Sequence, residues 1–177
     1  KKIVLKNRAM EIYLDIEDVY RDWVIHECGG EIPVKFPRHS AERDVLEVFI
    51  SRPPESYIPE PYQPGMLRIL LPEFKGRSTD RWFFLSNVAR RALVQCIKSR
   101  FDLQLWNELS RFGYIGTNQK DLIYAWMEKH GIEISDKNWN TIAKRYQRKR
   151  NYYLSTIRVK KYAAKNRNSE DENDNIE

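Results

Sequence analysis

The stretch NQKDLIYAWMEKHGIEISDKNWNTIAKRYQRKRNYYL, residues 118–154, predicts two helices joined by a short connector. Gly131 followed by Ile132 is typical of a helix that ends on a left-handed residue. Ser135 or Asp136 is a suitable cap for the helix that follows. The first helix spaces its apolar side chains three and four residues apart, at Leu122, Ile123, Trp126 and Met127. The pattern predicts a mainly α-helical fold.

The second predicted helix, residues 137–155, has two different sides. Its apolar stripe consists of Trp139, Ile142, Ala143, Tyr146 and Tyr153. The other faces carry Lys137, Asn140, Thr141, Lys144, Arg145, Gln147, Arg148 and Asn151. We therefore expect one side to pack in the core and the other to present cations, amides and a hydroxyl group to a partner.

The positive charge of the chain is concentrated in this region. Residues 137–169 contain eleven Lys or Arg and no Asp or Glu, whereas residues 1–136 contain 20 basic and 20 acidic residues. The acids of the last eight residues are Glu170, Asp171, Glu172, Asp174 and Glu177. A concentrated positive field favours a polyanionic partner, most often nucleic acid.

The sequence thus predicts a non-enzymatic nucleic-acid-binding protein, with DNA favoured over RNA. The candidate contact residues are Lys137, Asn140, Thr141, Lys144, Arg145, Gln147, Arg148, Lys149, Arg150, Arg158, Lys160 and Lys161. Lys and Arg bind phosphates or guanine edges, and amides can contact adenine. Asn140, Thr141 and Gln147 are therefore the candidate base readers.

Residues 118–154 resemble a helix-turn-helix pair, in which the second helix lies in the major groove. The resemblance implies a DNA-binding regulator. The connector GIEIS, residues 131–135, is longer than the three- or four-residue turn of the compact motif. A homeodomain-like or looser helical reader fits the pattern equally well.

Upstream of this pair the chain divides into recognisable regions. We predict an N-terminal helical region (1–52), a proline-rich arm or connector (53–79), a helical bundle (80–155), and a basic extension with a disordered acidic tail (156–177). Residues 53–72 contain six of the eight prolines, and MLRILL (66–71) allows a short β element.

Helical spacing and capping residues place the individual upstream helices. Residues 11–28 have helical spacing up to Gly29, and Ser40 is a suitable cap for a helix from residue 41. Asp80 or Ser86 can start a long helix that reaches about Arg111. Gly113 and Gly116 then break the chain, and Thr117 or Asn118 caps the next helix.

Two other functions remain as alternatives. The Pro- and Tyr-rich residues 53–72 could dock on a second copy or another protein, which describes an assembly or adaptor protein. A metal-dependent nuclease would use Asp15, Asp18 and Asp22, if these carboxylates share one face of a helix. Against nucleic-acid binding stands the simpler interpretation of a solvated charged helix face, or of a basic helix that contacts an acidic protein partner or the chain's own acidic tail.

No sequence motif predicts a cofactor or a metal site. His26, His39 and His130 are far apart and lack metal-ligand spacing with Cys28 and Cys96. His130 next to Gly131 fits a favourable cation at a helix end. No apolar run is long enough to span a membrane and the first 20 residues do not resemble a signal peptide, so we expect a cytoplasmic or nucleoid-associated protein.

Overall fold

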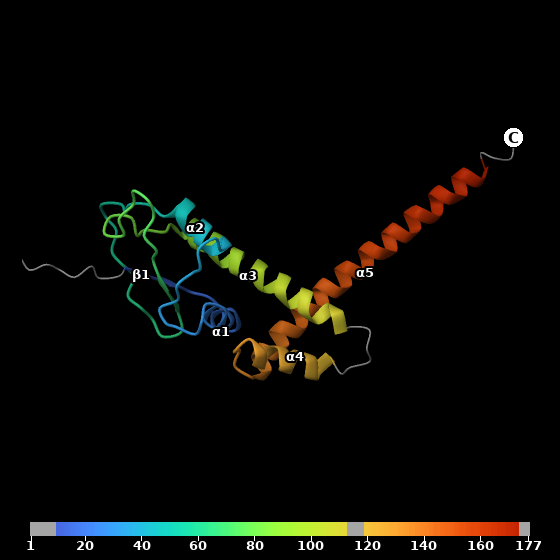
Figure 1. Ribbon diagram of the computed structural model, residues 1–177, viewed down its shortest axis with the longest axis horizontal. Helices are drawn as coiled ribbons and strands as arrows, with labels where there is room; N and C mark the ends of the chain where they lie inside the picture. The colour runs from blue at the N-terminus through green and yellow to red at the C-terminus, as the bar shows by residue number, and fades with distance from the viewer. Residues whose placement is uncertain (1–9, 113–118, 174–177) are drawn as a thin grey trace, which may run out of the picture.

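The computed structural model describes residues 10–112 and 119–173, which form a mainly helical fold with a small sheet (Figure 1). The elements are β1 (Glu11–Leu14), α1 (Asp18–Glu27), α2 (Ala41–Phe49), β2 (Leu67–Leu70), α3 (Asn87–Leu109), a 3₁₀ turn (Ser110–Phe112), α4 (Gln119–Lys129) and α5 (Asp136–Asn173). No helix among the described residues is both long and apolar enough to cross a lipid bilayer.

Helix α3 is the central element, and α1, α2 and α5 all contact it. It buries one residue per turn at Ala89, Leu93, Ile97, Phe101, Leu105 and Leu109. From α1, Tyr20 and Trp23 are fully buried against this stripe, and from α5 Ile142 and Tyr146 are buried. These buried side chains pack around α3 in one hydrophobic core, which also includes the buried side chains of the sheet.

Three of the predicted helix starts are confirmed. The hydroxyl groups of Ser40, Ser86 and Ser135 each accept a hydrogen bond, at 3.2 Å, from the backbone N–H three residues later. A serine at this position satisfies an amide that would otherwise have no partner inside the helix. The predicted caps Thr117 and Asn118 and the breaks at Gly113 and Gly116 lie outside the described residues.

The predicted helix over residues 11–28 is wrong in its first part. Residues 11–14 form β1, which pairs antiparallel with β2 so that Glu11 faces Leu70 and Leu14 faces Leu67. Alternate residues Ile12 and Leu14 are buried. A four-residue segment has little helix stability of its own, so pairing with a distant strand overrides its local spacing.

The strand predicted within residues 66–71 is confirmed as β2. The arm before it, residues 53–66, contains neither helix nor strand. Its aromatic rings contact the same chain: Tyr57 lies 5.0 Å from Phe84 and Tyr62 lies 5.3 Å from Tyr13, measured between ring centroids. Ile58, by contrast, is 84% exposed.

The predicted end of the last helix near residue 155 is wrong. Helix α5 continues without interruption to Asn173, and the predicted boundary near residue 155 lies inside this helix. The chain contains no Gly or Pro after Gly131, so the two residue types that most strongly interrupt a helix are absent from this stretch. Figure 1 shows the carboxyl-terminal half of α5 projecting away from the rest of the molecule.

Gly131 ends α4 as predicted, and it does so in a crowded place. Its φ is +63°, and the N–H of Ile132 donates a 3.0 Å hydrogen bond to the carbonyl of Met127. A Cβ on Gly131 would lie 2.8 Å from Cδ2 of His26. The glycine is therefore required both for its left-handed backbone and for the close approach of α1.

Replacing Gly131 by Ala is expected to lower the free energy of unfolding by more than the roughly 1–2 kcal/mol of left-handed strain, because His26 must also move. The matched control is Gly30→Ala, since Gly30 has φ of +79° and open space around its Cβ position. Urea unfolding of both variants measures the difference. Equal losses would show that the approach of His26 to Gly131 contributes nothing to stability.

Candidate nucleic-acid interface and a histidine–carboxylate cluster

Two of the predicted nucleic-acid contacts are engaged within the protein. Lys137 Nζ lies 2.9 Å from Asp18 Oδ2, which joins the start of α5 to α1. That hydrogen bond lowers the pKa of Asp18 and raises the pKa of Lys137. Arg145 Nη1 donates to both carboxylate oxygens of Asp102, at 2.9 and 2.8 Å, and its guanidinium lies 4.9 Å from the centre of the Tyr20 ring. Both cations fix α5 against the body.

Two of the predicted base readers, Thr141 and Gln147, form hydrogen bonds within α5 itself. The Thr141 hydroxyl donates to the carbonyl of Lys137 one turn earlier at 3.0 Å, and the Gln147 amide donates to Asn151 at 2.9 Å. Asn140 is exposed on α5. Amide groups held only by their own helix can exchange these bonds for contacts with a partner.

Four other cations of α5 face solvent and differ from Lys137 and Arg145 in their pairing. Lys144, Arg148, Lys149 and Arg150 are all exposed, and within the described part of the chain none has an ion pair. At 100° per residue, Lys144 and Arg148 lie on the side of α5 opposite the buried Ile142 and Tyr146. Some cations of the body, by contrast, are paired with carboxylates, as Arg68 is with Glu11 and Lys98 with Glu17.

An open hollow of about 480 Å³ lies beside these cations, between α3 and α5. Its lining residues are Asp102, Arg145, Arg148, Lys149 and Tyr152. Because Asp102 is neutralised by Arg145, the net charge of the lining is positive. Tyr152 is 73% exposed and offers an aromatic face at the rim. We call the set Lys144, Arg148, Lys149 and Tyr152 the basic face.

The remaining predicted contacts, Arg158, Lys160 and Lys161, lie further along α5, in the part of the helix that projects from the molecule (Figure 1). Since α5 is continuous, these positions extend the positive field along one rod rather than along a loose tail. The sequence pattern identified the cations but not the continuous helix that carries them.

The carboxylates considered for a nuclease are not arranged as the spacing predicts. Asp15 precedes α1 rather than lying on it. Asp18 and Asp22 both bind Arg21, at 2.8 and 3.0 Å. Their charges are therefore used to hold neighbouring side chains.

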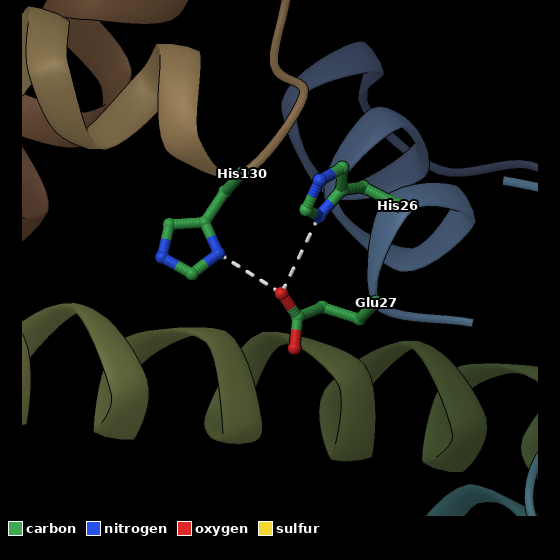
Figure 2. Close-up of side chains that lie close together, drawn as sticks. All are labelled: His26, Glu27 and His130. Atoms are coloured by element: carbon green, nitrogen blue, oxygen red, sulfur yellow. Dashed lines mark hydrogen bonds and ion pairs between the residues drawn. The ribbon is translucent and has the colours of Figure 1, made fainter. Parts of the chain in front are cut away.

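A second cluster joins residues that the sequence separates widely. The ends of α1 and α4 bring together His26, Glu27 and His130 (Figure 2). Glu27 Oε1 lies 2.9 Å from His130 Nδ1 and 3.6 Å from His26 Nδ1. In Figure 2 both rings turn a nitrogen toward the same carboxylate oxygen. Within the described residues this group can hold a metal ion.

His130 is held tightly in the cluster. It is 3% exposed, its Nε2 lies 3.0 Å from Glu108 Oε2, and its ring centroid is 4.4 Å from that of Trp126. Burial raises the pKa of Glu108, but hydrogen bonds from Lys129, His130 and Gln104 outweigh it and lower the pKa to about 2. Glu108 is therefore a carboxylate at neutral pH.

Sequence spacing could not reveal this cluster. His26 and Glu27 are adjacent, and adjacent residues do not normally share a helix face. His130 is 103 residues from Glu27. The one local signal was Gly131, whose missing side chain makes room for His26.

We compared the chain with protein-family models, curated proteins and solved structures, and nothing matches it in any of the three comparisons.

Proposed function

We propose that this protein binds nucleic acid without catalysing a reaction, and that the basic face on α5 is the central contact. The observation that carries the proposal is the contrast in pairing. Lys144, Arg148 and Lys149 are exposed without carboxylate partners, whereas Lys137 and Arg145 are used to anchor the same helix. Surfaces that are merely solvated normally mix both signs of charge.

Duplex DNA is the favoured ligand. A major groove of B-DNA admits an α-helix, whereas the deep, narrow major groove of A-form RNA does not admit side-chain readers. A helix-turn-helix-like use of α4 and α5 would place α5 in the groove with Asn140, Thr141 and Gln147 near base edges. The hollow between α3 and α5 is suited to a phosphate, because Arg148 and Lys149 line it.

The test is a salt-titrated anisotropy measurement with duplex DNA, single-stranded DNA and RNA. If about six phosphates are neutralised, log K falls with log salt with a slope near −5. The variant Arg148→Gln/Lys149→Gln should make this slope shallower by about 2, because two phosphate contacts are removed. Arg145 is unsuitable for this purpose, since its loss would also disturb the pair with Asp102.

The matched control is Arg38→Gln/Lys75→Gln, which removes the same charge from two exposed residues outside α5 that have no ion pair within the described part of the chain. It should leave the slope unchanged within error. Absence of binding to all three nucleic acids at low salt, or an equal effect of both double variants, would overturn the proposal. Tighter binding to single-stranded DNA than to duplex DNA would indicate that bases stack on Tyr152, and that α5 does not read a groove.

A further inference from the structure

The cluster of His26, Glu27 and His130, with Glu108 beside it, places two carboxylates around the His130 ring, an arrangement that needs either a second ring proton or a metal ion. His130 has a carboxylate oxygen at each ring nitrogen, 2.9 Å away at Nδ1 and 3.0 Å away at Nε2. A neutral imidazole has one N–H, so it can donate to only one of these carboxylates. The other nitrogen must therefore carry either a second proton or a cation between itself and the carboxylate.

The chemistry of the three groups fits a transition metal. Two imidazole nitrogens and one carboxylate oxygen suit Zn²⁺ and its neighbours, whereas Ca²⁺ and Mg²⁺ prefer all-oxygen sites. Metal–ligand distances of 2.0–2.2 Å in a tetrahedron place neighbouring ligand atoms about 3.4 Å apart. The ligand atoms here lie within 4.8 Å of one another, so small side-chain rotations close the site.

The surroundings also resemble those of metal-binding histidines. Such a histidine commonly donates its second N–H to a carboxylate, which fixes the tautomer and the ring orientation. Glu108 occupies that position at Nε2 of His130, and Trp126 packs against the ring.

We propose that His26, Glu27 and His130 bind one Zn²⁺ ion, or a chemically similar divalent transition metal, that clasps the carboxyl-terminal end of α1 to that of α4. With three protein ligands, a fourth position is left for water. His26, of which 48% of the side chain is exposed, gives the ion a path from solvent. This site is separate from the basic face, and its existence does not depend on nucleic-acid binding.

The test uses the full chain, without an affinity tag, treated with chelator and then titrated with Zn²⁺ by calorimetry. We expect one ion per chain and a higher midpoint of thermal unfolding in Zn²⁺ than in chelator. His26→Ala and Glu27→Gln should each weaken binding by about 100-fold or more, since loss of an outer hydrogen bond alone costs 10–100-fold. Co²⁺ bound to the same site should give the visible absorption bands of a tetrahedral complex.

His39→Asn is the matched control, because His39 is exposed and its φ of +66° is tolerated by asparagine. It should bind Zn²⁺ as the parent chain does. Because His26 is half exposed, its replacement should leave the fold intact, which circular dichroism checks. If Glu27→Gln proves unstable, the result for His26→Ala is sufficient to test the proposal. Lack of Zn²⁺ binding by the parent, or unchanged binding by His26→Ala, would overturn the proposal and leave a proton-bridged ion-pair cluster.

Discussion

Replacing Arg100 by Met is expected to lower the free energy of unfolding by about 3–5 kcal/mol, because it leaves a buried carboxylate without its partner. Glu42, in the first turn of α2, is fully buried. One of its oxygens, Oε2, accepts a 2.8 Å hydrogen bond from Arg100 Nη1, and the other, Oε1, has no hydrogen-bond partner among the described residues. Arg100 is thus the main compensation for the burial of this charge.

The control for this prediction is Arg91→Met, which makes the same exchange at an exposed position of α3. Chemical unfolding should show a change of less than about 1 kcal/mol for the control. Adding Glu42→Met to Arg100→Met should restore much of the lost stability, since a buried ion pair can be replaced by apolar side chains at little cost. A double variant as unstable as Arg100→Met would mean that Arg100 acts through its packing on Trp23, whose ring centre lies 4.9 Å from the guanidinium.

Replacing Phe101 by Ala should be comparably damaging, with an expected loss of about 3–5 kcal/mol. Phe101 is fully buried on α3 and makes edge contacts with Tyr20 and Trp23 of α1 and Trp126 of α4, at centroid distances of 5.0, 5.5 and 5.3 Å. Removal of the ring opens a cavity where three helices meet. Rigid aromatic neighbours cannot collapse into such a space without losing their own contacts.

Phe49→Ala provides the comparison, because Phe49 ends α2 and is 47% exposed. It should cost about 1 kcal/mol or less. Denaturant unfolding followed by tryptophan fluorescence measures both variants, since Trp23 and Trp126 border Phe101. Similar losses at positions 49 and 101 would contradict the central role assigned to the aromatic cluster.

The features that the sequence predicts well are those determined within a few residues. The serine caps at positions 40, 86 and 135 depend on a backbone N–H three residues away, and the end of α4 depends on Gly131 itself. The predicted apolar stripe of α5 is confirmed at Ile142 and Tyr146, which are buried, whereas its last member, Tyr153, is 46% exposed. Burial on one side of a helix imposes the regular spacing that makes such a stripe recognisable.

The features that it missed depend on partners far along the chain. Strand β1 forms because it pairs with β2. The two strands are far apart in the sequence: Glu11 of β1 and Arg68 of β2, whose side chains form an ion pair, are separated by 57 residues. Arg145 looked like a phosphate ligand, and only the packing of α5 against α3 reveals Asp102 as its partner. An apolar stripe or a run of charges shows which side of a helix is buried and which is exposed, but it does not show which distant residues contact each side.

Among the side chains that the structure describes, those of α5 that contact the body lie between Lys137 and Tyr153, and this arrangement has a mechanical consequence. Ion pairs at Lys137 and Arg145 and buried contacts at Ile142 and Tyr146 clamp its first turns. Residues 155–173 then form a lever about 28 Å long, at 1.5 Å of rise per residue. A tilt of about 5° at the clamp moves the far end by about 2.5 Å. A partner that binds the end of this lever would therefore exert a torque on the contacts that join α5 to α1 and α3.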